Sequence, residues 1–102
     1  MFVVIIPTMG NRIESKLFRL NERIMELHEQ ESRTSAELEM LRSLNDDFQR
    51  DAAVSGYLSD RADAQRANAD VERFERVLAG LAVQRGRLES QRETLLARLG
   101  DG

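Results

Sequence analysis

The residues most able to do chemistry in this 102-residue sequence are acidic side chains gathered around Gly56. Between Asn45 and Asp63, five aspartates accompany two arginines, so this stretch carries the net charge of −3 of the whole chain. It is either a docking site for a basic surface or a solvated loop capped by aspartate. The charged residues are Asp46, Asp47, Arg50, Asp51, Asp60, Arg61 and Asp63.

No other arrangement of side chains indicates chemistry. The sequence has no phosphate-binding glycine loop and no nucleophile beside a base. It contains no cysteine, and its single histidine, His28, has no second ligand at metal-binding spacing. We therefore expect no enzymatic activity, no cofactor and no bound metal.

The acidic stretch lies between two long segments whose apolar residues recur in alternating steps of four and three. This is the a/d spacing of a coiled coil, with Ile13 at d and Leu17 at a. Counting outward from Gly56, each seam position has a partner in the other segment, and the paired numbers add to 112. Each layer then joins an a to a d, as antiparallel helices require. The layers run from Ile13 with Leu99 to Phe48 with Ala64.

This symmetry predicts an all-α fold, a long antiparallel coiled-coil helical hairpin with helices at about 12–53 and 60–99. A continuous helix paired with a second chain would satisfy the same layers. Ser55 and Gly56, with Ser59 or Asp60 as a new N-cap, favour a turn near 54–59. Residues 11–102 then form a single domain.

The ends of the two helices carry further signals. Asn11 and Glu14 resemble a capping box at the start of the first helix, and glycines at 100 and 102 end the second. Residues 1–10 contain a β-prone apolar run, Met1 to Ile6, closed by Pro7. The run is too short to cross a bilayer. It is either a tail, with translation starting at Met9, or a short strand that pairs with a partner.

Three seam positions are polar. Glu31 and Thr34 lie opposite Leu81 and Leu78, and Glu31 is one layer away from Arg85. Glu31 and Arg85 either form an ion pair across the helices or extend to water beside the seam. Asn45, opposite Ala67, either fixes the register or is hydrated near the end of the rod.

The segment 77–83 is apolar on every side, which two helices alone do not cover. Gly80 and Gly86 interrupt the second helix, where each costs about 1 kcal/mol relative to alanine, so we expect a packing reason for them. Dimerisation into a four-helix bundle is the economical explanation, and a face for a different protein is the alternative. The candidate oligomer face is Val77, Leu78, Leu81 and Val83.

Composition narrows the possible partners. Charged residues make up 32% of the chain, and no cluster of lysine and arginine is free of interleaved acidic residues. We therefore expect no direct binding of nucleic acid. No segment is long and apolar enough for a membrane span, and the absence of cysteine fits a reducing compartment. These features favour a cytoplasmic protein.

The stretch Gly56-Tyr57-Leu58-Ser59-Asp60-Arg61-Ala62-Asp63, followed by Gln65, Ala67, Glu75, Leu78 and Leu81, resembles the hairpin tip of bacterial Gre-type transcript cleavage factors. In that family an N-terminal antiparallel coiled coil enters the secondary channel of RNA polymerase, and two acids at its tip help to hold the second catalytic metal.

By position, Asp60 matches the second of these tip acids and Tyr57 replaces the first. A missing carboxylate removes an oxygen ligand that a divalent ion needs. The resemblance therefore implies a polymerase-binding inhibitor or competitor more readily than a cleavage factor.

Two functions follow from these patterns. The first is a non-enzymatic interaction, scaffolding or adaptor module that forms a homodimer. The alternative is a transcription regulator that inserts its acidic tip into the polymerase channel. The candidate interaction tip is Asp51, Tyr57, Asp60 and Asp63.

Overall fold

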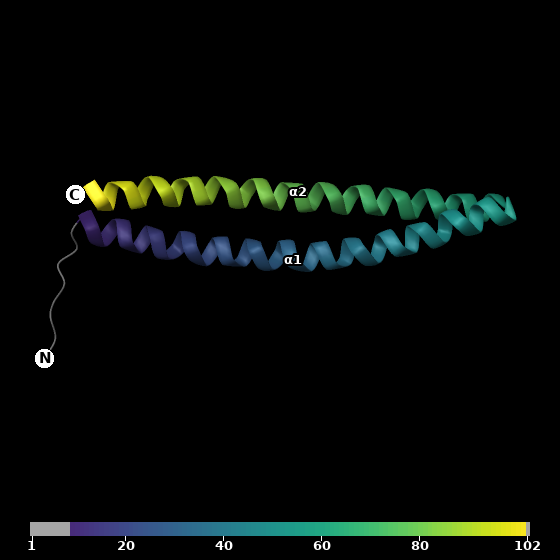
Figure 1. Cartoon of the computed structure of the whole chain (residues 1–102), viewed down its shortest axis with the longest axis horizontal. Helices are drawn as coiled ribbons and strands as arrows, with labels where there is room; N and C mark the ends of the chain where they lie inside the picture. Colours follow the sequence, from purple (N-terminus) through teal and green to yellow (C-terminus); the bar gives the residue numbers. More distant parts are fainter. Residues whose placement is uncertain (1–8, 102) are drawn as a thin grey trace, which may run out of the picture.

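The computed structural model describes residues 9–101, which form two helices joined by a tight turn. α1 spans Met9–Ser55 and α2 spans Leu58–Asp101. The helices lie side by side, so that the start of α1 and the end of α2 meet at one end of the rod (Figure 1). At 1.5 Å per residue, the 47 residues of α1 extend about 70 Å. The predicted helical hairpin is confirmed, and the chain does not continue as one helix through Gly56.

Both helices are longer than predicted. α1 begins at Met9, so Asn11 lies inside the helix and its predicted role as N-cap is wrong. Gly10 lies inside the first turn of α1, where glycine is tolerated, and the proline before it is Pro7. No residue between them requires the helix to begin as late as Arg12. α2 begins at Leu58 rather than at Ser59 or Asp60, and it continues through Gly100. The prediction for residues 1–8 lies outside the described residues.

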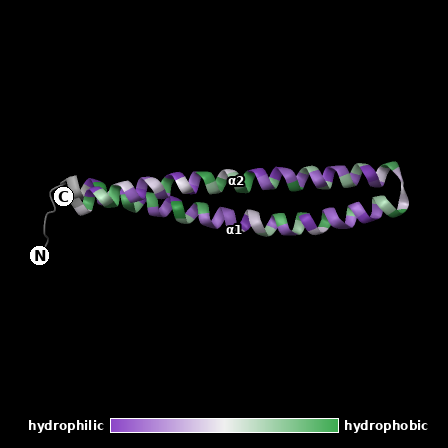
Figure 2. Cartoon of the chain, turned by 45° about the horizontal axis from the view of Figure 1, so that its top comes forward, coloured by the Kyte–Doolittle hydropathy of each residue, from purple (hydrophilic) through white to green (hydrophobic). Residues whose placement is uncertain are grey.

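The contact between the helices is a single line of side chains. From Ile13 to Ala52, every residue of α1 that is not exposed occupies the predicted four-three spacing. These positions are Ile13, Leu17, Leu20, Ile24, Leu27, Glu31, Thr34, Leu38, Leu41, Asn45, Phe48 and Ala52. Ile24, Leu27, Leu38, Ala64 and Val71 are buried. Apolar and polar residues alternate along both helices instead of gathering in one segment (Figure 2).

The seam is loosest at the open end of the rod. Leu99, predicted to close the layer with Ile13, is 38% exposed, and Ile13 is only part-buried. The two fully buried side chains, Leu27 and Leu38, lie in the middle of α1. The hairpin is therefore held chiefly by its central layers.

Candidate interaction surfaces

The turn at the tip is fixed by one glycine and one serine. Gly56 has a φ of +67°, the left-handed conformation that ends many helices, and its N–H donates to the carbonyl of Ala52 at 3.0 Å. The Oγ of Ser55 accepts the N–H of Tyr57 at 3.2 Å and donates to the carboxylate of Asp60. Ser55 thus joins the end of α1 to the first turn of α2.

The four residues of the candidate tip have different surroundings. Asp51 and Tyr57 are exposed, Tyr57 to 69%. Asp60 is part-buried and accepts the hydroxyl of Ser55, while Asp63 forms an ion pair with Arg66. Within residues 9–101, no three acidic or histidine side chains are grouped so that they could hold a metal ion.

The tip also carries apolar side chains that sequence reasoning did not select. Val54 is 88% exposed and Leu58 is 80% exposed, one on each side of the turn. The sequence could have identified both residues as exposed, because neither belongs to the four-three repeat of the seam. With Tyr57 and the surrounding aspartates, they make the tip both apolar and acidic.

The candidate oligomer face does not form one surface in the structure. Leu78 and Leu81 are part-buried at positions of the seam, whereas Val77 and Val83 are exposed to 49% and 54%. Six residues separate the two valines, so they lie on different sides of α2. Within the apolar segment 77–83, the two leucines therefore belong to the seam, and the two valines are exposed on separate sides of α2.

Glu31 and Arg85 form an ion pair across the seam, the first of the two alternatives that the sequence leaves open. Nε of Arg85 donates to Oε2 of Glu31 at 2.6 Å, and a second guanidinium nitrogen donates to Glu89 at 2.7 Å. The hydrogen bond between Arg85 and Glu31 holds the pKa of Glu31 below its usual value and raises the pKa of Arg85. Burial opposes both shifts. His28 is exposed, with its Nδ1 3.9 Å from Glu31.

Polar contacts bridge the two helices along one side of the seam, which we call the bridged face. Arg92 donates to Asn21 at 3.0 Å, Arg42 lies 3.8 Å from Glu75, and Gln49 donates to the carbonyl of Ala64 at 3.1 Å. Gln49 also donates to Oδ1 of Asn45 at 3.1 Å. Asn45 is part-buried, and this hydrogen bond lies within its own helix. Each cross-helix contact joins residues within one layer of the predicted pairing.

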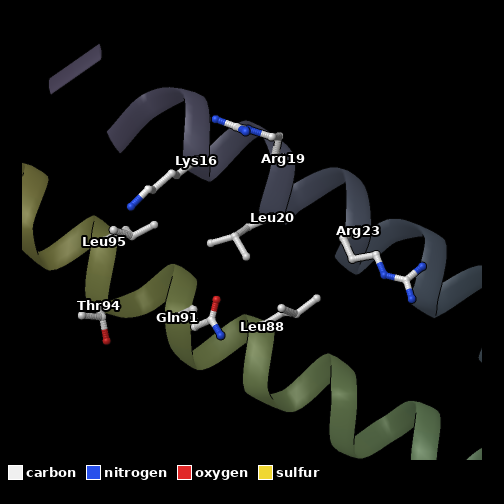
Figure 3. A pocket seen from close by; sticks show the side chains of 8 residues that line it. All are labelled: Lys16, Arg19, Leu20, Arg23, Leu88, Gln91, Thr94 and Leu95. Carbon is white, nitrogen blue, oxygen red and sulfur yellow. The ribbon is translucent and has the colours of Figure 1, made fainter. Parts of the chain in front are cut away.

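Two grooves open on the other side of the seam. The first, of 510 Å³, lies near the open end and has an apolar floor of Leu20, Leu88 and Leu95. Leu20 points from α1 toward α2 between the other two leucines, and Lys16 reaches toward α2 beside Leu95 (Figure 3). Its rim consists of Lys16, Arg19, Arg23, Gln91 and Thr94.

The basic rim was missed because charges alternate along the sequence. Glu14 and Glu22 lie among these cations in the chain, but neither lines the groove. Lys16, Arg19 and Arg23 are three or four residues apart and so share one side of α1. The helix therefore sorts interleaved charges into a basic side that sequence composition does not show.

The second groove, of 320 Å³, lies between the middle of the rod and the tip. Met40 and Leu44 from α1 meet Phe74 from α2, with Glu37, Asp70 and Arg73 around them. Met40 is 68% exposed and Leu44 is 49% exposed. This is an apolar strip beside the seam, of the kind that another helix could cover.

Comparison of the chain with protein-family models, with curated proteins and with solved structures returned no match. No helix among the described residues is long and apolar enough to cross a membrane.

Proposed function

We propose that this protein is a non-enzymatic helical-hairpin module that self-associates and serves as a scaffold or adaptor for other proteins. The observation that carries the proposal is the amount of apolar side chain outside the seam. Phe18, Met25, Met40, Val77 and Leu96 are each exposed by about half or more. A hairpin only two helices thick cannot cover them. A second hairpin packed on the side of the two grooves would cover Met40 and Val77, whereas Phe18, Met25 and Leu96 lie toward the bridged face.

Self-association is also consistent with how the seam is built. Only five apolar residues among those described are buried, so a single hairpin has a small core for a rod of this length. Packing two hairpins into a four-helix bundle would bury the outer sides of the half-buried seam residues. A bacterial cytoplasmic location is part of this proposal, because a chain without cysteine fits a reducing compartment.

Sedimentation equilibrium between about 1 and 100 μM tests the proposal, since dissociation constants of dimers of this size fall in the micromolar range or below. We expect wild type to sediment as a dimer and Val77→Glu to weaken the dimer at least tenfold. Val77 suits this test better than Leu81, because it is exposed and its replacement leaves the seam intact.

Val83→Glu is the matched control, because it adds the same charge to a similarly exposed valine on the outer side of α2. Circular dichroism must show unchanged helicity in both variants. A wild-type protein that stays monomeric throughout this range would contradict the proposal.

A second candidate function is supported by the tip. Val54, Tyr57 and Leu58 project from a narrow, acidic end of the rod, a shape that suits insertion into a basic channel. We propose as the alternative that the protein regulates transcription by docking this tip in the secondary channel of RNA polymerase.

Binding of purified bacterial RNA polymerase to wild type and to an Asp51→Ala, Asp63→Ala variant tests the alternative. These residues are preferable to Asp60, whose carboxylate also holds the turn through Ser55. We expect the variant to lose polymerase while keeping its helicity. Equal recovery of polymerase by both proteins would show that these tip aspartates do not bind polymerase.

A further inference from the structure

The side of the hairpin that contains the two grooves described above carries a graded charge, while a third groove, of 490 Å³, opens on the bridged face beside Gln49. We call the side with the two grooves the groove face and define it by the positions that flank the seam there, seven residues apart in each helix. From the open end to the tip, α1 contributes Lys16, Arg23, Gln30, Glu37, Leu44 and Asp51. Over the same length, α2 contributes Arg98, Gln91, Gln84, Val77, Asp70 and Asp63. Among these flanking positions, the basic residues therefore lie toward the open end and the acidic residues, from Glu37 onward, toward the tip. There Asp63 and Asp70 pair with Arg66 and Arg73 of the same helix.

This face differs from the bridged face in its contacts. Apart from the contact of Ser55 with Asp60 at the turn, every polar contact between the helices found among residues 9–101 involves the bridged face or the Glu31 and Arg85 pair of the seam. On the groove face Arg23, Asp63 and Asp70 pair only within their own helices, with residues three positions away. Such exposed pairs contribute little and exchange readily for other partners.

We propose that a second copy of this chain packs antiparallel on the groove face, about a two-fold axis that passes between Gln30 and Glu37. This inference rests on the self-association proposed above and assigns its interface. In this arrangement α1 lies along α1 of the other copy, and α2 along its α2. The charged residues at the two ends of the face then meet residues of opposite charge in the other copy.

The pairing follows from the spacing of the residues. Along α1, Lys16 meets Asp51, Arg23 meets Leu44, and Gln30 meets Glu37. Along α2, Arg98 meets Asp63, Gln91 meets Asp70, and Gln84 meets Val77. The symmetry repeats every contact, so four ion pairs close the two ends of the bundle. No like charges face each other in any of these pairs.

The alternative alignment of the same two faces is unfavourable. If the rods ran parallel, α1 would lie on α2 of the other copy, and Lys16 would face Arg98 while Asp51 faced Asp63. Like charges set against each other penalise that alignment. The antiparallel alignment also covers the apolar floors, because Leu20 and Phe74 would face helices of the second copy.

The two-fold axis lies near the middle of α1, which spans Met9–Ser55. The two rods therefore overlap along almost their whole length. The interface is also isologous and closed, which limits assembly to a dimer instead of an open fibre. A charge gradient centred elsewhere would have left one end of each rod uncovered.

Charge reversal with rescue in trans tests the proposal. One variant carries Lys16→Glu with Arg98→Glu, and the other carries Asp51→Lys with Asp63→Lys. We expect each variant alone to dimerise at least tenfold more weakly than wild type in sedimentation equilibrium, and an equimolar mixture to recover a dimer. The matched control for the first variant is Arg50→Glu with Arg76→Glu, which changes the net charge by the same amount on the outward side, and it should dimerise like wild type.

The outcomes separate this inference from the function on which it rests. If both reversed variants dimerise like wild type, or if their mixture stays monomeric, the groove face is not the interface, and self-association through another face survives. If wild type itself is monomeric, both proposals fail. Circular dichroism on every variant distinguishes lost dimerisation from lost folding.

Discussion

Leu27 should be among the most sensitive positions of the hairpin, because its side chain is 0% exposed and lies in the middle of the seam. Leu27→Ala removes three carbon atoms, which at about 0.8 kcal/mol each costs about 2.4 kcal/mol in lost transfer free energy. A cavity between only two helices is open at its sides and closes partly, so the added cavity cost is small. We expect the free energy of unfolding to fall by about 3 kcal/mol.

Leu96→Ala is the matched control, since Leu96 is 51% exposed outside the seam. It should cost about 1 kcal/mol or less, because about half of its side chain is already in water. Urea unfolding followed by circular dichroism at a fixed protein concentration measures both values. Equal losses for the two variants would refute the single-seam description of the hairpin, as would a loss below about 1 kcal/mol for Leu27→Ala.

Three further outcomes follow from the structure. Gly56→Ala should lower stability by about 1–2 kcal/mol, because alanine is strained at positive φ; an unchanged melting temperature would argue against this turn. Gly86→Ala should raise stability by up to about 1 kcal/mol in urea unfolding, because an added Cβ meets nothing within 4 Å; a loss would reveal a close neighbour. Arg85 lowers the pKa of Glu31 in the folded protein, so the pair should stabilise the fold fully above the unfolded-state pKa of Glu31, near 4.5. This stabilisation should be lost as the pH falls through the lower pKa of the folded state. Urea midpoints between pH 3 and 6 should then converge for wild type and Glu31→Gln at the acidic end, and a constant difference would contradict the pairing.

Much of the fold could be predicted from the sequence because its strongest signal is long and repetitive. A four-three spacing that holds from Ile13 to Phe48, with a matching series on the far side of Gly56, predicts both helices and the turn between them. Adjacent layers place the long side chains of Glu31 and Arg85 within reach of each other, but the sequence alone does not decide between their ion pair and two side chains extended to water. Helix ends depend on weaker local preferences, and those of both helices differed by two or three residues from prediction.

The surfaces were harder to predict because they depend on which side of a helix each residue occupies. The sequence predicts one oligomer face within segment 77–83, yet Leu78 belongs to the seam while Val77 and Val83 lie outside it. Likewise, the sequence marks Asp60 as a candidate tip residue and as a possible N-cap, but its contact with Ser55 appears only when the turn is built. Composition reports how many charges a segment holds, and only the helix geometry distributes them between faces.

Small-angle X-ray scattering of the wild-type protein at micromolar concentration tests most directly whether the hairpin pairs side by side with a second copy. Side-by-side pairing predicts particles with the mass of two chains and a maximum dimension close to that of one hairpin, about 70–80 Å. Two continuous helices of about 90 residues would have the same mass but extend about 140 Å. That longer dimension, or the mass of a single chain at every concentration, would contradict the account.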